Sequence, residues 1–288
     1  MRWWKPLIAR IVLATMTVAL GGLLSATLAR YAPGFSSDER LLDARLSRES
    51  VEAIRQERAE EGSVTSYYAG ALWRMAQGDL GISRTLQRPV RNLLSERALV
   101  TLRLVAGGLA TAWVAAMALM LATWLADSAG LDMAGTVLSG AMLCLPVGGV
   151  ALLLVVVNGP SFLAVALAVF PKIDRYLRNL LHLASRMPHV VTARAQGASP
   201  ERVLMWHIVP VIRRELLALA GVSVAVAIGA AIPVEALCGT PGIGQLAWQA
   251  ALGRDLPVLI NVSVLVIAFT VLANSGADLL AEERRLPA

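Results

Sequence analysis

The stretch ALVTLRLVAGGLATAWVAAMALMLATWLA, residues 98–126, decides the fold class of this chain. Its only charged residue is Arg103. A helix needs about 20 consecutive, mostly apolar residues to cross the hydrocarbon core of a bilayer. The stretch satisfies that requirement and predicts a transmembrane helix.

The composition of the whole chain points the same way. The 288 residues are 57% hydrophobic and 16% charged, and the mean hydropathy is +0.64. Soluble globular domains average about 45–50% apolar and about 25% charged residues. The chain has too few polar residues for an ordinary soluble domain, so we predict an all-α, polytopic membrane protein.

Apolar windows of similar length recur along the chain and predict about six transmembrane helices. They cover residues 7–29, 98–126, 133–157, 160–180, 215–238 and 257–280. These windows divide the chain into three parts: a cytoplasmic start with the first transmembrane helix at 1–29, an extracytoplasmic segment at 30–97, and a five-helix membrane core at 98–288. The core contains a polar loop at 181–214, which we expect to be cytoplasmic.

The distribution of arginine and lysine sets the predicted orientation, because short loops rich in these residues stay in the cytoplasm. With the N-terminus inside, the inside segments hold thirteen basic residues and the short outside loops hold only Arg254. Both termini are therefore predicted to be cytoplasmic. Segment 30–97 is long enough to be translocated whatever its charge. Its eleven basic and ten acidic residues nearly cancel, so it gives no clue to the charge of a substrate.

Several kinds of chemistry are disfavoured by the residues present. The lysines are Lys5 and Lys172, and neither lies in the G-x-x-x-x-G-K-[ST] pattern of a phosphate-binding loop, so the chain is not expected to hydrolyse ATP alone. Two cysteines, Cys144 and Cys238, make no disulfide framework. Three histidines lie in loop 181–214 without HExxH-type spacing, so we interpret them as structural or interfacial. We predict no catalytic residue, metal, cofactor or nucleic-acid partner.

The polar stretch PHVVTARAQGASPER, residues 188–202, predicts two helices separated by a turn. Pro188 suits a first helical position, and Gly197 suits a left-handed helix stop. Ser199, Pro200 and Glu201 then supply an N-cap, a fixed φ and an acid for the dipole of the next helix. On composition alone, an ordinary amphipathic connector is the favoured interpretation of this stretch.

The order of the residues in this stretch is more specific than its composition. TARAQG at 192–197, followed ten residues after the glycine by HIVP at 207–210, resembles the EAA loop of permease subunits of binding-protein-dependent ABC importers. The dipeptide, oligopeptide and nickel branch is the most similar. Further segments resemble that branch in order along nearly the whole chain: PG at 33–34, GDLGIS at 78–83, PV at 89–90, TLRL at 101–104, VE at 234–235, TPGIG at 240–244, RDLP at 254–257, and Asn274 with Asp278.

This resemblance implies a type I ABC importer permease fold, with the chain forming half of a pore across the cell inner (plasma) membrane. The implied partners are a homologous permease subunit, two cytoplasmic ATPase subunits that bind the ATP, an extracytoplasmic solute-binding protein and membrane lipid. The implied cargo is peptides or a related small solute such as a nickel complex. The residues implied to couple the chain to the ATPases are Thr192, Ala193, Arg194, Ala195, Gly197, His207 and Pro210.

Glu235 and Asp278 are acids within apolar windows, and each costs a few kcal/mol in lipid unless it is paired or hydrated. Each lies near the end of its window, where snorkelling towards the membrane surface is an alternative explanation. Between the last two windows, apolar residues at i, i+3, i+4 and i+7 predict a short helix that ends near Gly253. This helix is expected at the outer membrane surface, either capping a pathway or filling space. The candidates for a translocation path or outer gate are Glu235, Pro241, Gly242, Gly244 and Asp255.

Two other functional classes are compatible with an apolar helical chain. An ion-coupled secondary transporter would use ionisable residues in the membrane as a relay, and Arg103, Glu235 and Asp278 are the main candidates. An integral membrane enzyme would need a Ser/His/Asp set, a His/Glu metal cluster or a carboxylate pair, and the sequence shows none of these patterns. The sequence does not specify the cargo.

Overall fold

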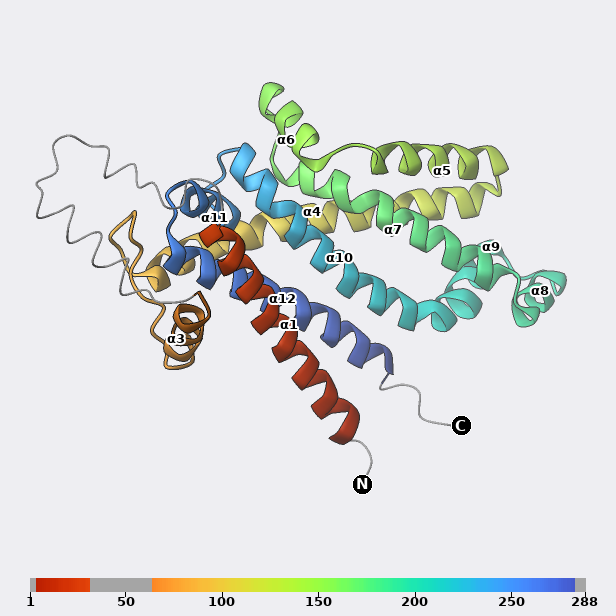
Figure 1. Cartoon of the computed structure of the whole chain (residues 1–288). Helices are drawn as coiled ribbons and strands as arrows, with labels where there is room; N and C mark the ends of the chain where they lie inside the picture. The colour runs from red at the N-terminus through yellow and green to blue at the C-terminus, as the bar shows by residue number, and fades with distance from the viewer. Residues whose placement is uncertain (1–3, 32–63, 283–288) are drawn as a thin grey trace, which may run out of the picture. The chain divides into compact units, whose positions relative to one another are not determined.

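The computed structural model describes residues 4–31 and 64–282, and it describes side chains for 12–28, 31 and 65–276. This part of the chain is built from helices (Figure 1), with one isolated bridge between Ile82 and Pro89 as its only extended pairing. The predicted all-α fold is confirmed. The predictions that fall on 32–63, including PG at 33–34, and on the side chain of Asp278 lie outside the described residues.

The helices follow one another along the chain with short connections. They are α1 (Trp4–Tyr31), α3 (Val64–Ala76), α4 (Val90–Ala126), α5 (Ala129–Leu143), α6 (Val147–Val156), α7 (Phe162–Ser185), α8 (Pro188–Ala195), α9 (Pro200–Arg202), the π-helical turn η2 (Val203–Ile208), α10 (Val209–Leu237), α11 (Ile243–Leu252) and α12 (Leu256–Glu282).

Three helices of the described chain are long and apolar enough to cross a membrane: α4, the continuous helix from Pro200 to Leu237, and α12. The pair α5 and α6 makes a fourth candidate if it is counted as one span. This is fewer than the six predicted, and the two remaining windows fall on α1 and α7. In α1 the part with described side chains, Val12–Leu28, is an apolar helix, and α7 carries four charged residues between 172 and 178. At 1.5 Å per residue, the 24 residues of α7 still extend for about 36 Å.

Two predicted spans differ from the observed helices. The window 133–157 is not one straight helix, because α5 and α6 meet at a bend of 92°. Pro146 lies at this bend, and proline disfavours a helical conformation in the residue before it. The helix predicted from residue 215 instead starts at Pro200. Arginine and glutamate at 213–215 end the apolar window, but they are good helix formers and do not interrupt the backbone hydrogen bonds.

The described residues form two compact units. Unit 1 contains those up to residue 99 together with 246–269, and unit 2 contains 100–245 and those from 270 onward. In unit 1, α1 packs against α3, and Gly22 leaves the space that the Tyr68 ring occupies. Ser25 and Ser263 join α1 to α12 through a 2.7 Å hydrogen bond between their hydroxyls. The buried core of this unit includes Ala26, Tyr68, Ala71 and Ile260.

Helix α7 is the centre of unit 2. It packs against α5, α6 and α10, and it continues towards α8 (Figure 1). Gly108 of α4 fits closely against Val165, because a Cβ at that glycine would lie 2.7 Å from the valine side chain. Residues four apart on a helix share one face, and such a row on α7 is buried: Val165, Val169, Ile173 and Leu177.

Many large apolar side chains remain exposed on the described chain. Val114, Val156 and Leu272 are each more than half exposed. Exposed apolar side chains in such number are expected where helices face lipid or another subunit. The fold therefore has a membrane-protein surface around a modest internal core.

Candidate coupling and gating sites

The end of α8 has the geometry that the sequence predicts for Gly197. The φ angle of Gly197 is +81°, in the left-handed region. Its N–H donates to the carbonyl of Arg194 at 2.9 Å, and the N–H of Ala198 donates to the carbonyl of Ala193 at 3.1 Å. These two bonds form a Schellman motif, which satisfies carbonyls that the end of a helix would leave unpaired.

The chain re-enters a helix within three residues. Ser199 is extended, and its hydroxyl oxygen accepts from the N–H of Arg202 at 3.4 Å, as predicted for an N-cap. Helix α9 then passes through the π-helical turn η2 into α10 without a break. Pro210 lacks the donor of a regular helix, and its ring would collide with the carbonyl of Trp206. The wider turn at η2, which contains His207, accommodates that proline.

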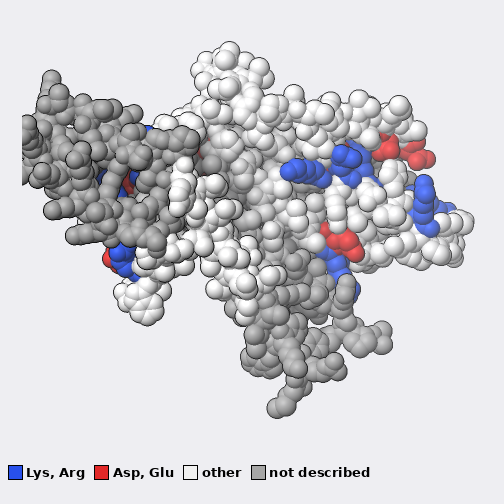
Figure 2. All heavy atoms as spheres, viewed as in Figure 1, with Lys and Arg blue, Asp and Glu red and all other residues white. Residues whose placement is uncertain are grey.

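Residues 188–210, which we name the EAA-like segment, expose one face of α8. Val190 and Ala193 are buried, and α8 packs on η2, where the His189 Nε2 lies 3.2 Å from the carbonyl oxygen of His207. Thr192 and Arg194 are exposed, as is Ala195. Figure 2 shows charged side chains of both signs spread along the course of α7 towards α9, among mostly uncharged surface.

A buried charge network on α5 and α7 was missed by sequence analysis. The Asp174 carboxylate is fully buried and accepts from Arg178 Nε at 2.9 Å and from the hydroxyl of Ser139. Arg178 Nη1 also donates to Asp132 Oδ1 at 2.7 Å. Gly135 belongs to this arrangement because a Cβ there would collide with the Arg178 guanidinium. The i, i+4 spacing of an acid and an arginine on α7 is the sequence signal for such a pair.

Glu235 is buried inside unit 2 and does not snorkel. Its side chain has no exposed surface, and Oε2 accepts from the N–H of Gly244 at 2.6 Å. The Thr101 hydroxyl oxygen accepts from the N–H of Ile243 at 2.8 Å and fixes the same loop to α4. A Cβ at Gly242 would collide with the Glu235 carboxylate. Glu235 therefore braces the loop 239–244, and the snorkelling interpretation of this residue is wrong.

Asp255 performs a similar task in unit 1. It is 1% exposed, and its Oδ2 accepts from the Ser83 hydroxyl at 2.5 Å and from the N–H of Thr85 at 3.0 Å. Its Oδ1 accepts from the N–H of Val258 at 3.3 Å and so caps α12. The motifs GDLGIS and RDLP, far apart in sequence, meet at this carboxylate. Among the outer-gate candidates, Glu235 and the residues at 241–244 belong to unit 2, whereas Asp255 belongs to unit 1.

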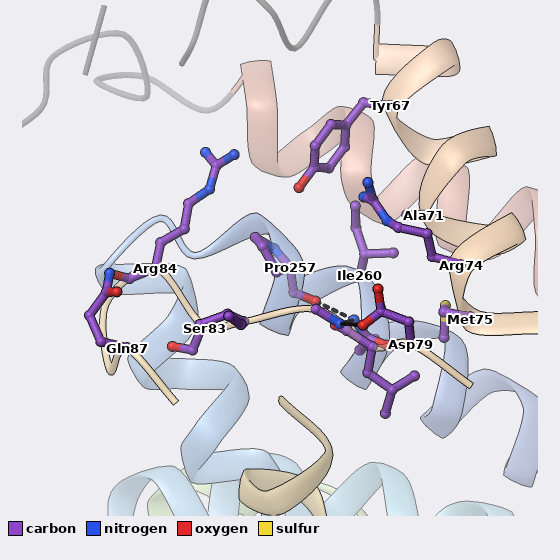
Figure 3. A pocket seen from close by; sticks show the side chains of 14 residues that line it. Tyr67, Ala71, Arg74, Met75, Asp79, Ser83, Arg84, Gln87, Pro257 and Ile260 are labelled. Atoms are coloured by element: carbon purple, nitrogen blue, oxygen red, sulfur yellow. Dashed lines mark hydrogen bonds between the residues drawn. The ribbon is translucent and has the colours of Figure 1, made fainter. Parts of the chain in front are cut away.

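A cavity of about 520 Å³ lies in unit 1 beside Ser83, the residue that donates to Asp255 (Figure 3). Its walls are α3, the loop 79–87 and the first turns of α12. Figure 3 shows Tyr67 and Arg74 on one wall and Arg84 on another, with Asp79 nearby. Because groups of both charges line the cavity, it does not select a ligand by net charge alone.

The short helix predicted between the last two windows is α11. Its residues Ile243, Leu246 and Ala250 are buried, and it ends at Leu252, one residue before the predicted stop. Arg254 then adopts a φ of +53°, which turns the chain into α12. The predicted helix and its buried face are thus confirmed.

The sequence model of the inner membrane component of binding-protein-dependent transport systems matches residues 108–283, which include the EAA-like segment and α12. The chain belongs to this family. It is therefore a multi-pass transport component of the inner membrane, and its resemblance to the permease subunits of ABC importers is confirmed.

Three relatives illustrate the branch. A Brucella suis protein, named provisionally as a peptide transport system permease protein, is 28% identical over an alignment of 317 positions, gaps included, that covers 95% of each chain. The di/tripeptide transport system permease protein DppB of Pseudomonas aeruginosa is 33% identical over 41% of this chain and 35% of its own. The oligopeptide transport system permease protein AppB of Bacillus subtilis is 30% identical over 42% of this chain and 38% of its own.

Proposed function

We propose that this chain is the permease subunit of a peptide importer that is powered by separate ATPase subunits. The family supplies the class of transporter, and the names of the three relatives support peptides as the cargo. The observation that carries the coupling role is the EAA-like segment. There, a short helix with one exposed face ends in a Schellman motif and leads directly into a long membrane helix.

The exposed face of α8 is suited to a groove on an ATPase subunit. Thr192 and Ala195 are exposed and small, so a partner can approach the helix closely. Large apolar side chains nearby are also exposed, with Met205 at 60% and Trp206 at 76%. Apolar surface beside a cluster of charges is the usual composition of a protein–protein interface. In this proposal four further predicted coupling residues shape the EAA-like segment or contact the ATPase. They are Arg194, Gly197, His207 and Pro210.

A continuous helix would carry motion from the ATPase to the outer side. The helix from Pro200 to Leu237 has 38 residues, about 57 Å at the standard rise. It starts beside α8 and ends at the loop that Glu235 braces. If ATP binding closes the ATPases and displaces α8, this helix moves the outer loop with it. Alternating access then follows from the different affinity of the ATPases for the inward-facing and outward-facing states.

The full assembly that we propose contains a homologous permease, two cytoplasmic ATPases and an extracytoplasmic solute-binding protein. The excess of basic residues in the inside segments supports cytoplasmic termini and a cytoplasmic EAA-like segment. The loop 239–244, which Glu235 braces, would then lie on the extracytoplasmic side, and so would Asp255 with its partner Ser83. Each of them is, by itself, a candidate element of the outer gate.

The experiment is uptake by the reconstituted assembly. The chain is purified with its permease and ATPase partners, placed in liposomes and supplied with a solute-binding protein loaded with labelled di- to pentapeptides. We expect peptide uptake that requires internal ATP and stops when the ATPases are omitted. Uptake driven by a proton or sodium gradient without ATPases would refute the proposal in favour of a secondary transporter. Uptake of a nickel complex and of no peptide would refute the cargo alone.

A further inference from the structure

Trp124 contacts the EAA-like segment on both sides of its turn. This residue lies in the last turn of α4, and its indole N–H donates to the carbonyl oxygen of Pro200 at 3.0 Å. The guanidinium of Arg194 lies over the same ring, with Cζ 4.6 Å from the ring centroid. Arg194 precedes Gly197 and Pro200 follows it. One side chain therefore holds the last turn of α8 and the first turn of α9.

The two contacts use different properties of the indole. The cation–π contact needs the face of the ring, and tryptophan provides the strongest such face among the aromatic side chains. The hydrogen bond needs the ring N–H, which phenylalanine lacks. Because the contacts are made on opposite sides of Gly197, rotation of α8 about that glycine breaks at least one of them.

Close packing does not replace these contacts. A cavity of about 310 Å³ lies against Trp124 and Arg194, and Asp132, Arg178 and His182 also line it. Side chains do not fill the space between the end of α4 and the segment at this place. The position of α8 relative to α4 therefore depends strongly on the contacts that Trp124 makes.

We propose that Trp124 is a positioning residue for energy coupling. It locks the turn at Gly197, so that a displacement of α8 moves α4 as well as α10. Helix α10 is continuous with the segment through η2, whereas α4 is joined to it through this side chain. The inference rests on the coupling role that we propose for the EAA-like segment. It adds a second membrane helix to the path of motion.

The test measures ATP hydrolysed per peptide imported by the complete assembly in liposomes. Trp124→Leu removes both contacts, and Trp124→Phe keeps the ring for Arg194 but removes the N–H. We expect Trp124→Leu to raise the ATP cost per peptide about tenfold, which is about 1.4 kcal/mol of lost coupling. Trp124→Phe is expected to raise it about threefold, and ATPase co-purification should stay within about twofold of wild type.

The matched control is Trp113→Leu. Trp113 is on the same helix, is also half-buried, and donates its indole N–H to the Ser223 hydroxyl at 3.1 Å, away from the EAA-like segment. A variant that only reduces the amount of folded protein lowers ATP hydrolysis and peptide uptake in proportion. The ATP hydrolysed per peptide imported should therefore stay within about twofold of wild type for Trp113→Leu. If Trp124→Leu gives the same unchanged ratio, the proposal is overturned.

Arg194→Gln provides an independent variant at an exposed position, for use if Trp124→Leu does not accumulate. We expect it to raise the ATP cost about threefold in the wild-type background and to add nothing in the Trp124→Leu background, where both contacts are already gone. Full additivity would overturn the proposal. Gly197→Val, measured in parallel, separates the two levels. If it disrupts ATPase binding while Trp124 variants change nothing, only this inference fails; if it binds and transports like wild type, the proposed coupling role fails.

Discussion

Replacing Gly197 by valine tests the coupling role most directly, because the substitution acts through the backbone alone. A Cβ at this position would meet no atom within 4 Å beyond its chain neighbours, so the site has room for that atom. The φ of +81° is the obstacle. Left-handed backbone costs an ordinary residue about 1–2 kcal/mol, and a β-branched residue more.

The chain can avoid that strain only by giving up the Schellman motif. The two bonds that would be lost run from Gly197 N to Arg194 O and from Ala198 N to Ala193 O. Each contributes about 0.5–1.5 kcal/mol, so either route costs about 1–3 kcal/mol. The relaxed variant must return to the strained geometry when α8 enters its groove. Affinity for the ATPase should therefore fall about tenfold to a hundredfold.

The assay is titration of the purified ATPase onto the permease pair in nanodiscs, together with co-purification from membranes. Gly239→Val is the matched control, since Gly239 also has a positive φ of +65° and open space around its Cβ position, but lies beyond the other end of α10. It should bind the ATPase normally. Gly197→Asn should recover much of the affinity, because asparagine tolerates the left-handed region.

Normal ATPase affinity for Gly197→Val would refute this reasoning. The segment would then be an ordinary connector, which is the alternative that composition alone allows. Reduced affinity in both valine variants would show that strain anywhere near α10 disturbs the complex. The argument for a specific docking helix would fail in that case too.

Three further predictions concern stability and orientation. Glu235→Ala leaves the buried N–H of Gly244 without an acceptor. It should lower the free energy of unfolding by about 1–3 kcal/mol and the melting temperature in detergent by several degrees. Glu235→Gln keeps an acceptor and should lower the free energy of unfolding by less. Gly135→Ala pushes the Arg178 guanidinium out of its ion pairs. It should lower the free energy of unfolding by about 3 kcal/mol or more, as measured by thermal unfolding. Single cysteines at Gln77 and Ser199, both exposed, should differ in labelling by an impermeant thiol reagent on intact cells, with only the first reacting.

Each of these has an internal control and an outcome that contradicts it. Gly140→Ala, on the same helix as Gly135 but with nothing within 4 Å of its Cβ position, should be nearly neutral. Equal melting temperatures for the two alanine variants would rule out the proposed collision. Equal stability of the alanine and glutamine variants at Glu235 would remove its role as a brace. Labelling at Ser199 and not at Gln77 would reverse the orientation.

Local signals allowed the sequence to predict α8 and α11 closely. Proline at a helix start, glycine at a left-handed stop and an N-cap serine act on their own backbone, so Pro188, Gly197 and Ser199 were interpreted correctly without tertiary information. The apolar face of α11 followed from its spacing. Span boundaries were less accurate, because hydropathy marks where lipid begins while the helix continues through charged residues to Pro200.

The sequence by itself determined the membrane class, the helical architecture and the family, because these depend on composition, periodicity and the order of residues along the chain. Tertiary structure alone decided which polar groups meet. Asp255 binds Ser83, Arg178 binds Asp132, and Trp124 spans the turn at Gly197. These contacts join residues 46 to 172 positions apart. No local pattern encodes them, because a buried polar side chain finds its partner through the packing of whole helices.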